Sequence, residues 1–106
     1  MLRKYEFCLL LAPELDQDGL EKETASISEI MTSAGASVIH RELWGRRGLM
    51  YPVKKKKEGY YYLFYIEAEP EVLKKIEDGL RHRESVLRVL SIARKEFSGL
   101  IKDGKS

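Results

Sequence analysis

The sequence predicts an α+β domain, with a four-stranded antiparallel sheet and two helices packed on one face of it. Alternating apolar residues indicate four strands, within residues 4–13, 36–53, 60–69 and 85–94. Apolar residues at steps of three or four indicate two amphipathic helices, one after the first strand and one after the third. The order strand, helix, strand, strand, helix, strand is the ferredoxin-like βαββαβ pattern.

The first strand, KYEFCLLLAP, is expected to lie in the middle of the sheet. Its aromatic and leucine side chains alternate on one face while Cys8 and Leu10 occupy the other, and apolar residues on both faces are typical of a buried strand. Either Asp16 or Asp18 can cap the helix that follows. Gly35 comes directly after the apolar stripe of that helix, where a left-handed residue commonly ends a helix.

The middle of the chain predicts a long hairpin. ASVIHRELWGRRGLMYPV has strand character, and its two glycines, Gly45 and Gly48, indicate a bend or bulge rather than an end. The polar segment Lys54–Gly59 is expected to form the hairpin loop. YYYLFYIEAE, rich in aromatic residues, is the strongest strand signal in the chain.

Pro70 suits the first turn of the second helix, and SVLRVLSIAR is expected to be the last strand. Residues 1–95 should therefore form one ferredoxin-like domain, followed by a flexible tail over residues 96–106. The chain of 106 residues is 43% hydrophobic and 34% charged, which is typical of a folded globular domain. Because no apolar run approaches the roughly 20 residues of a membrane span, we expect a cytoplasmic protein.

The third strand leaves three apolar side chains on the face of the sheet away from the helices. Side chains alternate along a strand, so Tyr61, Leu63 and Tyr65 are expected to point there. An exposed apolar patch of this kind usually marks an interface with another protein. The alternative is that the C-terminal tail covers these residues.

Charge is divided unevenly along the chain, although the net charge is only +2. Six acidic residues and one basic residue lie between Glu14 and Glu29, in the first predicted helix. The balance reverses between Arg41 and Lys57, where seven basic residues accompany one acidic residue. A protein with separate acidic and basic sides orients itself in the field of a polyanion.

The basic clusters predict RNA binding by residues 1–95. Flexible lysines suit an irregular phosphate backbone, and arginine forks clamp phosphates or stack on bases. The candidate residues near the hairpin and in the last loop and strand are Arg46, Arg47, Lys54, Lys55, Lys56, Lys57, Arg81, Arg83 and Arg88. The alternative for the lysine run is a solvated hairpin tip that guards an edge strand.

Catalysis finds little support in the sequence. His40 and His82 do not stand in metal-ligand spacing, and the lone Cys8 makes neither a disulfide nor a metal site. An acyl-phosphate hydrolase is the nearest enzyme of this fold, and Arg3 is its only candidate residue here. We therefore predict no enzyme, no catalytic residue, no metal, no cofactor and no small-molecule substrate.

Three segments together point to a known family. They are RKYEFCLLLAPELD, LWGRRGLMYPVKK and GYYYLFYIEAEPEVLKKIEDGLRHRESVLRVL, in this order and spacing. In these segments the chain resembles the bacterial small-subunit ribosomal protein S-six family, over about residues 2–93. The resemblance implies a non-enzymatic ribosomal protein that binds the central domain of the small-subunit (16S-type) ribosomal RNA. It also implies a heterodimer with a companion, ribosomal protein S-eighteen.

Carried over position by position, the resemblance adds Arg3 to the RNA-binding candidates and supports Arg46, Arg47, Lys54 and Arg88. The companion protein is expected to contact an apolar set of side chains, namely Trp44, Tyr51, Tyr61, Leu63 and Tyr65. The competing hypothesis is a non-ribosomal protein-interaction or regulatory module that pairs through a sheet edge or the bare sheet face.

Overall fold

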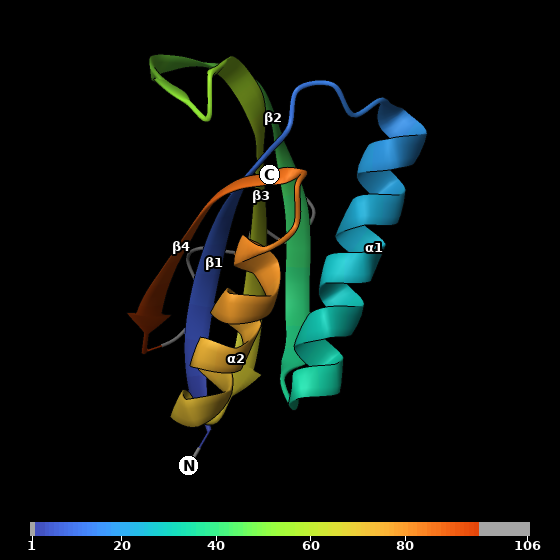
Figure 1. The fold of residues 1–106 in the computed structure, drawn as a ribbon. Helices are drawn as coiled ribbons and strands as arrows, with labels where there is room; N and C mark the ends of the chain where they lie inside the picture. Colours follow the sequence, from blue (N-terminus) through green and yellow to red (C-terminus); the bar gives the residue numbers. More distant parts are fainter. Residues whose placement is uncertain (1, 96–106) are drawn as a thin grey trace.

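The computed structural model describes residues 2–95 and contains one antiparallel sheet and two helices (Figure 1). The strands are β1 (Arg3–Leu11), β2 (Ser37–Val53), β3 (Lys56–Ala68) and β4 (Val86–Arg94), and the helices are α1 (Gln17–Ala34) and α2 (Pro70–Arg81). The strands lie side by side in the order β2-β3-β1-β4. The predicted βαββαβ fold is therefore confirmed.

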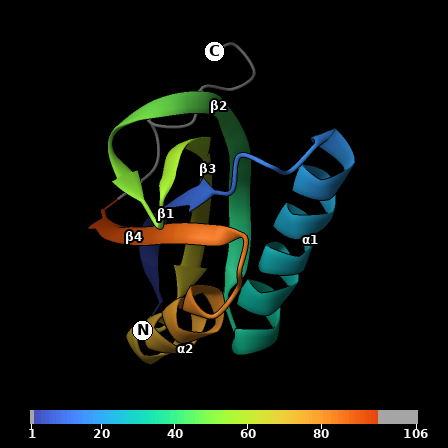
Figure 2. The same cartoon turned by 45° about the horizontal axis from the view of Figure 1, so that its top comes forward.

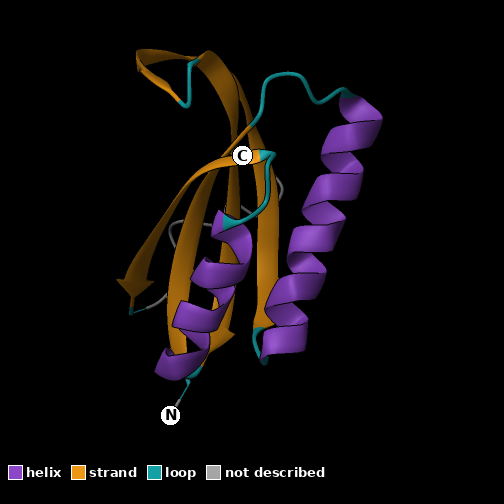
Figure 3. Cartoon of the chain, in the orientation of Figure 1, coloured by secondary structure: helices purple, strands orange, loops and turns teal. Residues whose placement is uncertain are grey.

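Both helices lie on one face of the sheet, which gives the molecule two layers (Figure 3). The core fills the space between the layers and is made of fully buried aromatic and aliphatic side chains. They include Phe7, Leu9, Leu11, Ile27, Met31, Phe64, Ile66, Ile76 and Leu80. The other face of the sheet, here called the open face, carries no helix.

Strand β1 is central because it pairs with β3 on one side and β4 on the other. Leu10 and Leu11 are both buried, so the end of β1 is apolar on both faces, as its sequence predicted. Helix α1 begins at Asp16, whose carboxylate accepts a hydrogen bond of 2.7 Å from the backbone N–H of Gly19. It ends at Gly35, which has a φ of 112°.

Strand β2 is long and irregular, as Gly45 and Gly48 indicated. Its pairing with β3 shifts register three times, and Gly45 has a φ of 116°. Beyond Gly48 the strand bends over the end of the sheet, and the hairpin turn approaches β4 (Figure 2). The bend brings the lysine-bearing turn close to β4, which the turn could not reach if the sheet were flat.

The loop predicted over Lys54–Gly59 is shorter than expected. Strand β3 already begins at Lys56, so only Lys54 and Lys55 form the turn. Both have positive φ, 50° and 69°, as a two-residue type I′ hairpin turn requires. The expectation of a loop came from polarity, whereas pairing of Val53 with Lys56 sets the strand boundary.

The expectation that Leu63 and Tyr65 are uncovered is wrong. They are 1% and 2% exposed on the open face, where Cys8 packs against them and the His40 ring stacks on the Tyr65 ring at 5.7 Å. Alternation predicted correctly that they point away from the helices, but it could not show what lies over them. Tyr61 is half-buried. The predicted tail, residues 96–106, lies outside the described residues.

Candidate nucleic-acid interface

Three connections meet at one end of the sheet, and most of the predicted RNA-binding residues lie in or beside them. They are the β2–β3 turn, the loop from β1 to α1, and the loop from α2 to β4, which approach one another in Figure 2. The Nζ of Lys54, in the turn, donates a hydrogen bond of 3.4 Å to the backbone carbonyl of Val86 at the start of β4. The turn is thereby held against the last strand.

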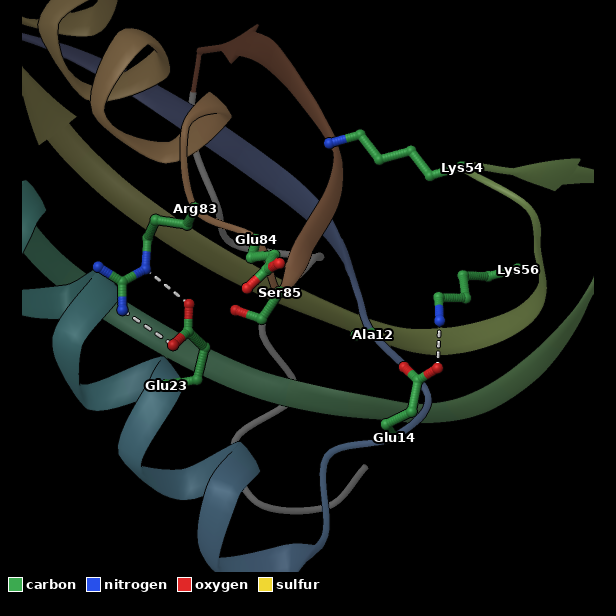
Figure 4. A pocket seen from close by; sticks show the side chains of 8 residues that line it. All are labelled: Ala12, Glu14, Glu23, Lys54, Lys56, Arg83, Glu84 and Ser85. Carbon is green, nitrogen blue, oxygen red and sulfur yellow. Dashed lines mark hydrogen bonds and ion pairs between the residues drawn. The ribbon is translucent and has the colours of Figure 1, made fainter.

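The first groove at this end has a volume of about 670 Å³ and is called the mixed groove (Figure 4). Its lining residues are Ala12, Glu14, Glu23, Lys54, Lys56, Arg83, Glu84 and Ser85. Three of them are basic and three are acidic. The groove therefore offers no excess of positive charge to a phosphate.

Two of the cations in the mixed groove are held by carboxylates. The Arg83 fork donates to Glu23 through Nε at 2.6 Å and Nη2 at 2.9 Å, and the Nζ of Lys56 donates to Glu14. These hydrogen bonds lower the pKa of both glutamates, and Glu23 raises the pKa of Arg83. Both glutamates and Arg83 are therefore charged at neutral pH.

The second groove, about 370 Å³ in volume, is called the basic groove. It is lined by Lys54, Arg81, Val86, Leu87, Arg88 and Val89. Three of these side chains are basic and none is acidic. Within residues 2–95, neither Arg81 nor Arg88 forms an ion pair, so their guanidinium groups are available to an anion.

Arg46 is engaged within the protein and does not present a free fork. Its guanidinium donates two hydrogen bonds of 3.0 Å to Glu58, one of 3.2 Å to the carbonyl of Pro13 and one of 3.2 Å to the Tyr60 hydroxyl. The group also lies 5.5 Å from the centre of the Tyr60 ring. Glu58 raises the pKa of Arg46, and Arg46 lowers that of Glu58.

The remaining candidates are exposed, but they do not all lie together. Arg47 follows Arg46 on β2, Lys55 lies in the turn, and Lys57 lies just after it on β3. Arg3 lies at the opposite end of β1, where it pairs with Ala68, so it is separated from both grooves by the length of the strand.

The sequence alone does not reveal the role of Glu14 and Glu23. We expected the acidic segment to form a side of its own, yet these two carboxylates lie among the basic side chains and bind them. Glu23 belongs to α1 but contacts the α2–β4 loop, 60 residues later in the chain. Helical periodicity places Glu23 on a face of α1 but does not say which loop packs there.

The predicted companion-contact residues differ in exposure. Trp44 and Tyr51 are exposed on β2 and Tyr61 is half-buried, whereas Leu63 and Tyr65 are buried. The carboxylate of Glu42 accepts one hydrogen bond from the Trp44 indole at 2.7 Å and contacts His40 Nε2 at 2.9 Å. The bond from the indole holds the Trp44 ring at the edge of the open face.

Two further apolar residues, not predicted from the sequence, are exposed on the open face. Leu90 pairs with Cys8, and Ile92 pairs with Glu6, so both side chains of β4 point to this face, and both are exposed. Alternation along SVLRVLSIAR was the signal that could have found them.

Other kinds of site find no support in the described part of the chain. No group of His, Cys, Asp and Glu between residues 2 and 95 is arranged to hold a metal ion. Neither helix of this range is long and apolar enough to cross a membrane. Burial and the nearby Glu6 carboxylate raise the pKa of the Cys8 thiol, so it is a poor nucleophile at neutral pH.

Comparisons with known proteins agree with this arrangement. The family model described as ribosomal protein S6 matches residues 4–93. Small ribosomal subunit protein bS6 of Phocaeicola vulgatus is 33% identical over 97 residues, which cover 92% of this chain and 85% of the relative. The bS6 protein of Fusobacterium nucleatum is 35% identical over 91 residues, 86% of this chain and 97% of the relative.

Among solved structures, 30S ribosomal protein S6 from Thermotoga maritima superposes with a TM-score of 0.82. The two are 23% identical, and the match covers 89% of each chain, so it supports the fold. The family match spans nearly the whole described chain, from the second residue of β1 to the last but one of β4. The chain therefore belongs to the ribosomal protein S6 family.

Proposed function

We propose that this protein is a non-catalytic structural component of the small ribosomal subunit, in the cytoplasm, that binds the central domain of the small-subunit ribosomal RNA. It does so together with a second small protein, S-eighteen. The observation that carries the RNA-binding part is the basic groove, which Lys54, Arg81 and Arg88 line without a carboxylate.

The groove suits a phosphate backbone in chemistry as well as in charge. Arginine forks donate paired hydrogen bonds to phosphate oxygens, and a lysine supplies a flexible point charge. Val86, Leu87 and Val89 add apolar surface beside these cations. Exposed Lys55, Lys57 and Arg47 extend positive charge along the hairpin.

An apolar surface for the companion protein lies next to the end of the sheet that carries the basic groove. Trp44 and Tyr51 on β2, together with Leu90 and Ile92 on the open face, are exposed. Aromatic residues of this kind contribute much of the binding energy at protein interfaces. Arg3 is a separate proposed RNA contact, at the end of β1 opposite the two grooves.

The RNA step is tested by the salt dependence of binding. The triple variant Lys54→Ala/Arg81→Ala/Arg88→Ala removes the cations of the basic groove. If three phosphate contacts are lost, the slope of log K against log salt should become shallower by about 2 to 3. The measurement is filter binding of a central-domain ribosomal RNA fragment over a range of KCl, with and without S-eighteen.

A matched control is the variant Lys22→Ala/Lys74→Ala/Lys75→Ala, which removes the same charge from exposed positions on the helices. Its slope should stay close to that of the unmodified protein. Equal slopes for the two triple variants would reject the basic groove as the phosphate site. Failure of the unmodified protein to join the fragment even with S-eighteen would reject the proposed function.

A further inference from the structure

Two neighbouring grooves share Lys54 but differ in net charge, and this difference has a consequence for RNA recognition. The basic groove carries three cations and no carboxylate, whereas the mixed groove balances three cations with three carboxylates. We infer that Glu14 and Glu23 are specificity determinants, which exclude RNA phosphates from the mixed groove and confine the backbone to the basic groove. This inference rests on the proposed function.

The contact between Glu23 and Arg83 has the geometry that a bound phosphate would have. The carboxylate takes one edge of the guanidinium, Nε and Nη2, at 2.6 and 2.9 Å. An arginine clamps a phosphate through the same paired donors, so a phosphate can bind this edge of Arg83 only by displacing Glu23. The Glu23 side chain is only 13% exposed, so little solvent screens its charge.

Glu14 does the same for Lys56 on the other wall of the groove. Its carboxylate pairs with the Lys56 ammonium, and Figure 4 shows this pair apart from the Arg83–Glu23 pair, with Lys54 pointing toward β4. Lys54 is the only one of the three cations lining the mixed groove that contacts a neutral carbonyl instead of a carboxylate.

Glu14 and Glu23 thus disfavour binding of the wrong RNA and do not strengthen binding of the right one. A surface with every cation free would bind any RNA through counterion release, because that term carries no sequence information. Repulsive groups placed beside an attractive site raise discrimination, since they penalise every backbone path except the one that avoids them. The position of Glu14 and Glu23 leaves the path over Lys54, Arg81 and Arg88.

The test replaces both guarding carboxylates with neutral isosteres, Glu14→Gln/Glu23→Gln. Freeing Lys56 and Arg83 should steepen the salt slope for a scrambled RNA of equal length by about 0.7 to 0.9 per cation. The affinity ratio between the central-domain fragment and the scrambled RNA should fall. Both are measured by filter binding in the presence of S-eighteen.

The control is Glu21→Gln/Glu29→Gln, which makes the same change in net charge at two exposed positions of α1. It separates the local effect from a general loss of negative charge. If both double variants change the slope and the affinity ratio equally, the inference is overturned. Circular dichroism establishes that each variant is folded, and Glu14→Gln alone, at an exposed position, gives half of the expected slope change should the double variant unfold.

The outcomes for the inference and for the proposed function are distinguishable. An unmodified protein that does not prefer the central-domain fragment to the scrambled RNA would reject both. Suppose that the unmodified protein prefers the central-domain fragment and that Glu14→Gln/Glu23→Gln keeps the same preference. This result would reject only the inference that Glu14 and Glu23 exclude phosphates from the mixed groove.

Discussion

Gly59 illustrates how one missing side chain allows close packing beside the basic end of the sheet. It is buried on β3, and a Cβ atom there would lie 2.7 Å from the backbone oxygen of Leu11 and 2.8 Å from Cδ1 of Leu10. Both distances are shorter than van der Waals contact. The absence of a Cβ therefore allows β1 and β3 to approach at this position.

We expect Gly59→Ala to lower the free energy of unfolding by about 1 to 3 kcal/mol, because the clash involves backbone that cannot rotate away. Urea denaturation measures the change. Gly48→Ala is the control, since no atom lies within 4 Å of its added Cβ, and it should stay within about 0.5 kcal/mol of the unmodified protein. Equal losses for both variants would contradict the packing argument.

The two-residue turn holds two lysines in a backbone conformation that favours Asn and Gly. Left-handed φ costs an ordinary L-residue roughly 1 to 2 kcal/mol, whereas glycine avoids the clash but loses more chain entropy. We expect Lys54→Asn/Lys55→Gly to raise the free energy of unfolding by about 1 kcal/mol. Thermal and urea unfolding measure it.

The charge-matched control for the turn is Lys54→Ala/Lys55→Ala, which removes both charges but keeps the unfavourable φ values. It should give no such gain. Were the alanine variant stabilised as much as the Asn-Gly variant, relief of charge repulsion in the lysine run, rather than backbone conformation, would be the cause.

Helix α1 is tied to the loop before β4 by the Glu23–Arg83 pair, which links elements far apart in sequence. Hydrogen bonds from Arg83 lower the pKa of Glu23. A group whose pKa is lowered on folding stabilises the fold fully above its unfolded pKa, about 4.3 for Glu. This stabilisation is lost as the pH falls through the lower pKa of the folded protein.

We expect Glu23→Gln to lower the free energy of unfolding by about 1 to 3 kcal/mol at pH 7, the range for hydrogen bonds to charged groups. The difference from the unmodified protein should shrink as the pH falls below about 4. Urea unfolding between neutral and acidic pH measures it. Glu29→Gln, on the same helix, is the control. A difference for Glu23→Gln that stays constant with pH would show that charge is not involved.

At the scale of the whole molecule, periodicity and caps were enough to predict the fold. Each predicted strand and helix is present, because alternation and the 3.6-residue repeat report directly on which face is buried. The exact turn was missed because polarity does not distinguish a loop from an exposed strand, as Lys56 and Lys57 show.

The basic residues of the candidate site could be predicted from the sequence, but the carboxylates that pair with them could not. The basic residues of the hairpin and of the last loop do meet at one end, since adjacent strand ends must. Which of them stay available depends on partners distant in sequence, such as Glu14 for Lys56 and Glu23 for Arg83. No periodic pattern encodes such tertiary contacts.

The central position of β1 also bears on how the protein is made. Residues near the start of the chain pair with residues near the end of β4, as Lys4 does with Arg94. At a synthesis rate of roughly 5 to 20 residues per second, the emerging β1 waits several seconds with its β4 side unpaired. The first strand to leave the ribosome is thus among the last to be completed, and its edge toward β4 stays unpaired until then.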